Sequence, residues 1–269
     1  MGLNQNYYIK KDLLLSASYE KQRTFKSDLS DSSKDFTAYS LGLNYRHKDW
    51  IYDLKGEYRE SDSDKKINLD FNSYTNFDSD IGFLFAYNHR GEFFKDRKTI
   101  LDSINLSSAY RTNESFILLD KLKLSREKRG KVDKDIALLR VLSKIKASDK
   151  NLFYASYAIK YLKESIEDRS YDSLIDIFGF EYIYQLNRLF EIGVNTSLYH
   201  LYSSEDFKDS IGAFLGFNIF KNLYLGIGYN FMGYSDYDFD RFTQRDRGLF
   251  LNFKIKFDKE GLEDIVKSF

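Results

Sequence analysis

The sequence predicts an all-β chain that crosses a membrane as an antiparallel up-and-down β-barrel of about fourteen strands. Three observations predict this fold. Apolar and polar residues alternate with a period of two, turns recur at regular intervals, and aromatic residues gather near the ends of the expected strands. The 269 residues contain no proline, which fits a chain of paired strands because proline removes a donor from a β-ladder.

Composition excludes several classes of protein. No cysteine is present, which excludes a disulfide scaffold, a thiolate metal site and a cysteine nucleophile. The 41 basic and 41 acidic residues cancel, whereas a nucleic-acid-binding protein needs a basic surplus. No apolar run reaches the roughly 18 residues of a transmembrane helix. Residues 1–5 lack the features of a signal peptide, so we expect either a cytosolic chain or a mature or excised piece of a longer protein.

The alternation is clearest near the C-terminus. One face of the expected strand 249–257 is apolar throughout: Leu249, Leu251, Phe253, Ile255 and Phe257. The other face carries Asn252, Lys254 and Lys256. Residues 50–59 and 211–219 alternate in the same way. Four glycines of the C-terminal strands, at 212, 216, 226 and 228, fall on the polar side, where a missing side chain relieves crowding or permits bending.

Two kinds of connection alternate along the chain. Short polar turns recur roughly three dozen residues apart, near Lys11, Lys48, Asp78, Asn113, Asp149, Asn187 and Lys221. Between them lie connections that are usually longer and richer in charge, at 24–35, 61–65, 91–99, 127–135, 164–173, 203–210 and 235–246. Tight turns at one end of a barrel and longer loops at the other are typical of outer-membrane proteins.

The turns divide the chain into fourteen expected strands, each about as long as a tilted strand needs to cross a bilayer. They cover residues 12–23, 36–46, 50–60, 66–75, 81–90, 100–111, 116–126, 136–146, 152–163, 174–185, 189–202, 211–220, 223–234 and 247–257. Residues 3–9 also alternate, so residues 1–11 are a candidate for part of a preceding strand, and sixteen strands are the alternative count. We expect one barrel domain over residues 1–257 and a short helical tail at 258–269.

Aromatic residues distinguish a membrane barrel from a soluble β-sandwich, in which apolar side chains would point into one core. In a membrane barrel they point outward to lipid, and amphipathic rings favour the bilayer interface. Aromatic residues fall on the expected outer face near strand ends: Tyr7, Tyr19, Tyr45, Trp50, Tyr58, Tyr87, Tyr110, Phe116, Tyr161, Tyr184, Phe190, Tyr229 and Phe257. We therefore expect the chain to lie in the outer membrane, with the lipid bilayer as a partner.

The polar face is expected to line the lumen of the barrel. The lumen-lining candidates are Asp53, Lys55, Glu57 and Arg59 on one strand, and Lys121, Lys123, Arg140 and Lys144 on a hairpin. Unpaired charges are costly in a dry core, so the lumen should be wet or laced with ion pairs. The hairpin set is either a cationic stripe for anions or lumen lining balanced by acids such as Glu181 and Glu191.

The residues predict no catalytic, cofactor-binding or metal site. Among the three histidines, only His200 has hydroxyls near it in the sequence, Ser197 and Ser203, and a histidine of the aromatic belt is favoured over a hydrolase arrangement. Four aspartates, Asp236, Asp238, Asp240 and Asp246, could hold Ca²⁺, but the glycine and glutamate of an EF-hand loop are missing. We expect a solvated loop there and no cofactor.

The C-terminal third resembles the closing hairpin of a family of Gram-negative outer-membrane barrels that form the C-terminal region of large repeat-containing surface proteins. The resemblance rests on residues 221–234, Asp236, Asp238, Phe239, Arg241, Phe242, Thr243 and 249–258, extends through 176–182 and 193–200, and is weaker at 35–42 and 58–59. It implies that the chain is the excised or truncated barrel of a longer protein. It implies a membrane anchor or pore, and no catalytic residues accompany it.

Two functions follow as expectations. The first is a membrane anchor for a larger surface or exported assembly, with a possible upstream passenger domain as partner. The alternative is a passive, porin-like diffusion pore, because a barrel of about fourteen strands is wide enough to hold water. The final strand, with Phe257 as its aromatic end, is expected to be read by barrel-insertion machinery. We expect no enzymatic activity.

Overall fold

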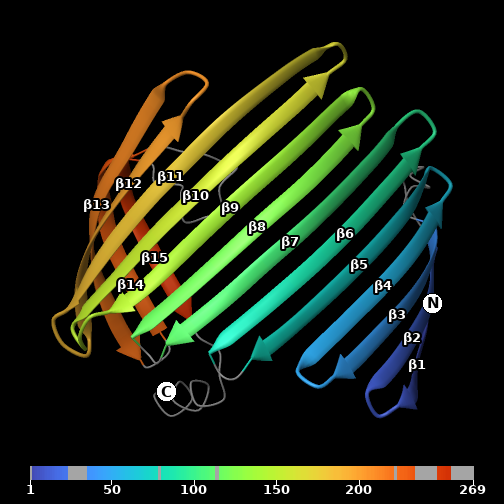
Figure 1. Cartoon of the computed structure of the whole chain (residues 1–269), viewed down its shortest axis with the longest axis horizontal. Helices are drawn as coiled ribbons and strands as arrows, with labels where there is room; N and C mark the ends of the chain where they lie inside the picture. Colours follow the sequence, from blue (N-terminus) through green and yellow to red (C-terminus); the bar gives the residue numbers. More distant parts are fainter. Residues whose placement is uncertain are drawn as a thin grey trace. The chain divides into compact units, whose positions relative to one another are not determined.

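The computed structural model describes residues 2–23, 35–77, 80–112, 115–220, 223–233 and 247–255. These residues form fifteen strands, and each strand is hydrogen-bonded to the next one along the chain in an up-and-down order (Figure 1). The strands are β1 (Gly2–Lys10), β2 (Leu13–Gln22), β3 (Phe36–His47), β4 (Trp50–Ser61), β5 (Asp64–Phe77), β6 (Ile81–Phe94), β7 (Lys98–Thr112), β8 (Phe116–Arg129), β9 (Val132–Lys146), β10 (Asn151–Ile166), β11 (Arg169–Gln185), β12 (Phe190–Leu201), β13 (Asp206–Phe220), β14 (Leu223–Met232) and β15 (Gly248–Ile255).

The fourteen expected strands correspond to β2 through β15, so the all-β prediction is confirmed. The additional strand is β1, which pairs with β2 from Gly2 opposite Glu20 to Lys10 opposite Leu13. Residues 1–11 therefore include a nine-residue strand, and the count of strands among the described residues lies between the two expected values. No helix among the described residues is both long enough and apolar enough to span a membrane.

Several predictions fall outside the described residues. They concern the acidic group Asp236, Asp238, Asp240 and Asp246, the aromatic end Phe257, and the tail 258–269.

The expected asymmetry between short turns and long loops is wrong for several connections. Only two residues separate β4 from β5, β8 from β9, and β10 from β11. The charged residues of these segments continue the strands instead of forming loops, because their side chains pair across the hairpin. At the β8–β9 tip, Arg126 lies 3.6 Å from Asp133 and 3.5 Å from Asp135. Gly130, with φ of 60°, allows the tight turn between them.

The chain divides into two compact units. One comprises residues 1–111, 119–140 and 160–174, and the other comprises residues 112–118, 141–159 and 175–269. We call them the first and the second unit.

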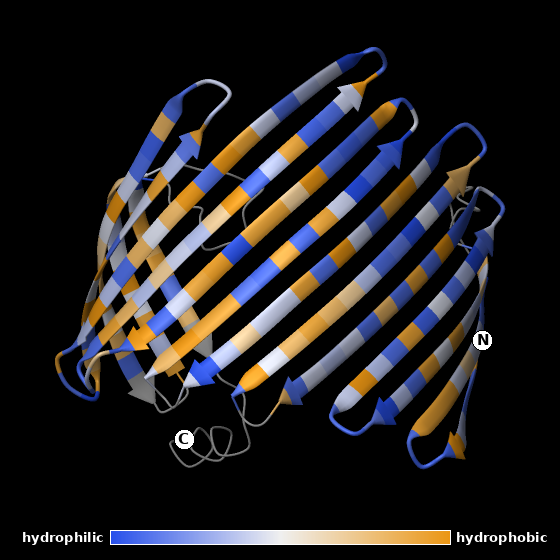
Figure 2. Cartoon of the chain, in the orientation of Figure 1, coloured by the Kyte–Doolittle hydropathy of each residue, from blue (hydrophilic) through white to orange (hydrophobic). Residues whose placement is uncertain are grey.

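The first unit has one apolar and one polar face. Direct cross-strand pairing places apolar residues in one row across six strands: Leu15, Leu43, Leu54, Phe71, Tyr87 and Ile104. The row one residue further along each strand lies on the opposite face and consists of polar residues and glycine: Ser16, Gly42, Lys55, Asp70, Asn88 and Ser103. Figure 2 shows the same alternation along the strands as bands of opposite hydropathy. The period of two read from the sequence therefore sorts side chains to opposite faces.

The second unit repeats this division over β11 to β15. Its apolar row is Tyr184, Ile192, Leu215, Ile227 and Leu251, and the adjacent row is Gln185, Glu191, Gly216, Gly226 and Asn252. The apolar row is open to the surroundings: Leu215 is 52% exposed and Leu251 is 68% exposed. A soluble β-sandwich would bury such residues, whereas a membrane barrel presents them to lipid.

Glycines on the polar face of the second unit make room for aromatic rings. The ring of Phe214 lies against Gly193, and the ring of Phe250 lies against Gly228, where a Cβ would stand. At Gly216, Glu191 Cγ and Tyr224 Oη each lie 2.6 Å from the position that a Cβ would take. The expectation that glycines on this face relieve crowding is confirmed, since larger residues would collide with these side chains.

Aromatic side chains on the apolar face meet near the short turns. Trp50 contacts Tyr52 and Phe77 with ring centroids 6.0 and 6.1 Å apart, and Phe77 contacts Phe83 at 6.0 Å. Tyr45 and Tyr52 stack at 6.1 Å. Such a cluster of amphipathic rings suits a bilayer interface.

The turn between β9 and β10 carries an exposed ion pair. Lys146 Nζ lies 2.8 Å from Asp149 Oδ1, and its hydrogen bond lowers the pKa of the Asp149 carboxyl. The pair therefore favours the folded state above the ordinary carboxyl pKa, and its contribution is lost as the pH falls through the lowered value. Because Asp149 is fully exposed, solvent screening keeps that contribution small.

Candidate functional site: the polar face of the sheet

The four predicted residues of β4 share one face. Asp53 stands between Asn44 and Asn72, and Lys55 stands between Gly42 and Asp70. Glu57 stands between Ser40 and Asn68, and Arg59 stands between Ala38 and Lys66. Their neighbours Leu54 and Tyr58 belong to the apolar face. The structure thus brings all four to the polar face of the first unit.

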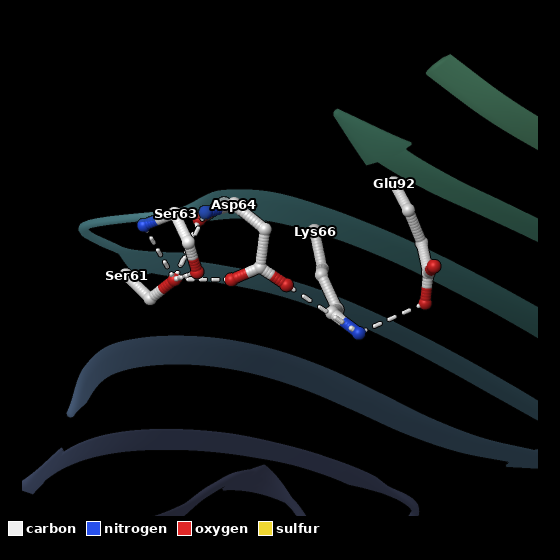
Figure 3. A network of polar contacts seen from close by, with 5 residues as sticks. All are labelled: Ser61, Ser63, Asp64, Lys66 and Glu92. Carbon is white, nitrogen blue, oxygen red and sulfur yellow. Dashed lines mark hydrogen bonds and ion pairs between the residues drawn. The ribbon is translucent and has the colours of Figure 1, made fainter. Parts of the chain in front are cut away.

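Charges on this part of the polar face are largely paired. Lys55 Nζ lies 3.7 Å from Glu57 Oε2. Lys66 Nζ lies 2.9 Å from Glu92 Oε1 and 3.5 Å from Asp64 Oδ2 (Figure 3). The Arg59 guanidinium stacks 3.9 Å above the ring of Phe36.

The hairpin between β4 and β5 is fixed by the hydroxyl of Ser61. This oxygen accepts hydrogen bonds from the backbone N–H groups of Ser63 and Asp64, at 3.3 and 3.0 Å, and its proton is donated to the Asp64 carboxylate (Figure 3). The hairpin therefore holds the Asp64 carboxylate in place beside the Lys66 ammonium.

The predicted basic residues of β8 and β9 lie opposite an ion-paired face. The contacts of Arg126 with Asp133 and Asp135 place these three side chains on one side of the β8–β9 hairpin. Strand alternation then places Lys121 and Lys123 of β8 and Arg140 of β9 on the other side. Lys144 has the same phase as Arg140 along β9, within the second unit.

A hollow of about 340 Å³ lies beside β8 and β9 in the first unit. Its walls include Tyr87, Ile104, Leu124, Ala137 and Tyr161, together with Arg126 and Asp135. The Ser108 hydroxyl donates a hydrogen bond to the Asp120 carboxylate, and Ser108 has the same phase along β7 as Ile104 of the apolar row. Asp120 and, by strand alternation, Arg126 therefore lie on the apolar face. Lys121, Lys123 and Arg140 therefore project from the polar face, as Lys55 does.

The basic residues differ from those of β4 in their partners. Within the described part of the chain, Lys121, Lys123 and Lys144 form no ion pair. An ammonium group without a counter-charge needs water or a bound anion. We call Lys121, Lys123 and Arg140, which all belong to the first unit, the basic stripe.

The polar face of the second unit carries carboxylates and buried polar side chains. Glu191 is hydrogen-bonded to Tyr224, and Glu181 lies directly opposite Asn195. Asn195, Asn230, Ser197 and Ser210 are buried, and the hydroxyls of Ser197 and Ser210 are 2.8 Å apart. The sequence pattern points to the two glutamates and, beside His200, to Ser197. It does not single out Asn195, Ser210 or Asn230, because isolated polar residues in an alternating strand resemble ordinary solvated positions.

His200 lies among aromatic rings. His200 stacks on Phe207 with ring centroids 4.0 Å apart, on the apolar face. Ser197 faces the other way, toward Ser210, so the favoured interpretation of His200 as part of the aromatic belt agrees with the structure. His89 Nδ1 lies 2.7 Å from Asp102 Oδ1, a cross-strand pair that only the register reveals.

No group of three or more potential metal-binding histidine or acidic side chains occurs among the described residues.

Comparison with known proteins identifies the fold. No family model matches the sequence, and no curated protein sequence matches it significantly. The outer-membrane channel DcaP of Acinetobacter baumannii is similar in structure, with a TM-score of 0.53 and 10% identity over 95% of this chain and 97% of that chain.

Two siderophore receptors of Pseudomonas aeruginosa are also similar. The ferric enterobactin receptor PfeA, in a G324V mutant, gives a TM-score of 0.60 and 9% identity over 81% of this chain and 43% of the receptor. PirA gives a TM-score of 0.54 and 10% identity over 85% of this chain and 41% of the receptor. The matched region therefore spans less than half of either receptor.

The chain has the fold of a transmembrane, antiparallel, up-and-down outer-membrane β-barrel. The exposed apolar face and the aromatic cluster of the two units agree with this class, and an outer-membrane location is supported. The similar structures are described as a channel and as receptors.

Proposed function

We propose that the chain forms a water-filled diffusion pore in the outer membrane, with the polar face lining the lumen. The observation that carries this proposal is the absence of ion pairs for Lys121, Lys123 and Lys144 among the described residues. Three ammonium groups without counter-charges are stable in contact with water but costly in a packed interior. The similarity to DcaP, a channel matched over 95% of this chain and 97% of that chain, supports the same function.

The basic stripe favours small anions as the transported solutes. Ions crossing a pore are selected by rings or rows of charged side chains at close range. The charges of β4, by contrast, alternate in sign along the strand and are partly paired, so they add little net field. Asp53, Lys55, Glu57 and Arg59 remain lumen-lining candidates under this proposal, without a role in selectivity.

Single-channel recording in planar bilayers tests the proposal, with the double variant Lys121→Glu/Lys123→Glu. A charge about 4 Å from an ion in water contributes about 1 kcal/mol. Reversing two charges should therefore lower the anion-to-cation permeability ratio roughly fivefold or more. The shift should shrink at high salt, because exposed charges are screened.

A matched control places the same change in net charge at the tip of the hairpin. Lys128 and Lys131 are paired there with Asp133 and Glu167, at 3.6 and 2.8 Å. The variant Lys128→Glu/Lys131→Glu should leave selectivity close to that of the parent. Equal shifts in the two double variants would contradict a lumenal position for the basic stripe.

The second candidate function is a membrane anchor. The resemblance of residues 221–258 to the closing hairpin of large surface proteins favours it, and so does the ion-paired network of Lys66, Asp64 and Glu92. In this case the barrel domain, residues 1–257, would hold an upstream passenger in the membrane. A folded, membrane-inserted chain that shows no steady conductance would favour the anchor over the pore.

Recognition of the last strand by barrel-insertion machinery is part of both proposals. Removing residues 253–257 should prevent membrane assembly, because it deletes the end of the strand that pairs with β14. Removing residues 258–269 should leave assembly intact. Protease protection in isolated outer membranes measures both outcomes, and assembly after the first deletion would count against this role.

A further inference from the structure

Charged side chains form a row on the apolar face of the first unit, across β6 to β9. His89 Nδ1 lies 2.7 Å from Asp102 Oδ1, and the Asp102 carboxylate interacts electrostatically with the Arg126 guanidinium. Arg126 in turn lies 3.5 Å from Asp135. His89 and Asp102 are directly opposed and have the strand phase of the apolar row, so this charged row lies on the face that meets lipid.

The charged row lies near the end of the strands. Arg126 comes four residues before Gly130, at the tip of the β8–β9 hairpin. An arginine on the lipid-facing side of a barrel is costly at the bilayer midplane and costs little near the interface. The side chains of Arg126 and Asp135 are 54% and 48% exposed. Lipid head groups, and not acyl chains, are therefore the groups that meet this row.

The hollow of about 340 Å³ lies beside the charged row. Asp102, Arg126 and Asp135 line it. The rest of its wall is largely apolar and includes Tyr87, Ile104, Leu124, Ala137 and Tyr161. The short side chain of Ala137 leaves space among these larger residues. In a bilayer an acyl chain covers an apolar surface on this face, and a chain seated in the hollow gains contacts with its walls.

The charges around the hollow favour a head group that carries both signs. Arg126 and Lys128 face three carboxylates, those of Asp102, Asp133 and Asp135, so no surplus of positive charge awaits a purely anionic head group. The contacts of Arg126 with Asp133 and Asp135 are 3.6 and 3.5 Å long and involve Nη2 and Nε. Both are longer than the roughly 2.7–2.9 Å of a charge-assisted hydrogen bond. The guanidinium, which has five N–H donors, can therefore also bind a phosphate.

We propose that this hollow binds one molecule of phosphatidylethanolamine. One acyl chain fills the apolar part, the phosphate accepts hydrogen bonds from Arg126, and the ammonium donates hydrogen bonds to Asp102 and Asp135. Two carbons separate the phosphate ester oxygen from the ammonium, so both groups reach neighbouring side chains at once. A choline head group has no N–H donor, and a glycerol head group has no positive charge. The site depends on the outer-membrane fold and is independent of whether the lumen conducts.

Native mass spectrometry of the full chain, refolded in detergent micelles, tests the site with dioleoyl lipids of three head groups. Phosphatidylethanolamine should saturate at one molecule and bind about fivefold or more tightly than phosphatidylglycerol or phosphatidylcholine, as expected for one charge contact at about 4 Å. Arg126→Gln should weaken its binding by a similar factor of about five. Ala137→Phe should weaken it about tenfold or more, because the ring takes the space of several methylene groups.

Two variants outside the hollow are the matched controls. Ala17 lies on the apolar face opposite Leu41, which is 70% exposed, and Ala17→Phe controls for Ala137→Phe. Lys66→Gln removes a cation from the polar face and controls for Arg126→Gln. Both controls should bind the lipid as the parent does. Absence of saturable binding, equal affinity for the three lipids, a preference for phosphatidylglycerol, or equal binding by the variants and their controls would each overturn the proposal.

Discussion

Leu251→Arg is expected to lower the free energy of unfolding by about 2–4 kcal/mol, the cost of an arginine on the lipid-facing side of a barrel near the bilayer midplane. Leu251 lies directly opposite Ile227 in an apolar row that continues to Leu215 and Ile192. It is 68% exposed, so an arginine there causes no steric clash and its cost comes from lipid contact.

The neighbouring residue supplies the control for this prediction. Asn252 is half-buried on the polar face, opposite Gly226, where an arginine head group meets polar neighbours and not lipid. Asn252→Arg should therefore change stability by less than about 1 kcal/mol. Denaturant titration of both variants in lipid vesicles measures the two values. Equal losses at 251 and 252 would contradict the assignment of the apolar face to lipid.

Gly228→Ala is expected to destabilise the barrel by about 1–3 kcal/mol, because it overpacks a filled site. A Cβ at this position would lie 2.7 Å from the carbonyl oxygen of Ala213, 2.7 Å from the Cβ of Phe214, and against the ring of Phe250. The first two atoms belong to the backbone or are attached to it directly, so a side-chain rotation does not relieve the collision.

Gly56→Ala is the matched control for the glycine prediction. Its Cβ would meet only Leu69 Cδ1, at 4.0 Å, and alanine loses less conformational freedom than glycine when a strand forms. This variant should be neutral or more stable by up to about 1 kcal/mol. Thermal unfolding of both variants in the same detergent distinguishes them, and a neutral Gly228→Ala would show that β13 and β14 tolerate separation.

Packing around Gly228 also predicts a partial rescue. Adding Phe250→Ala to Gly228→Ala removes the ring but leaves the contacts with Ala213 and Phe214. The double variant should therefore lose less stability than the sum of the two single variants, since residues in direct contact are not additive.

Local sequence pattern predicted most of the fold. A period of two fixes which side chains share a face, and it fixes this for any strand regardless of its partners. The placement of Lys55 with Arg59, and of Lys121 with Lys123, follows from that period alone. Strand ends were predicted less well near the hairpins at Gly130 and Glu167. Both faces of the strands carry polar residues there, so the segments resemble loops in sequence.

The sequence by itself determined the alternation, the absence of proline and cysteine, and which charged residues of one strand share a face. Only the tertiary structure decided which side chains meet across strands. His89 finds Asp102, and Asn195 and Asn230 meet over Gly212, because the register of each hairpin sets its partners and a shift of one residue would move every side chain to the other face. A contact that joins three neighbouring strands depends on the registers of both strand pairs. A local sequence pattern contains neither register, so it cannot predict the contact.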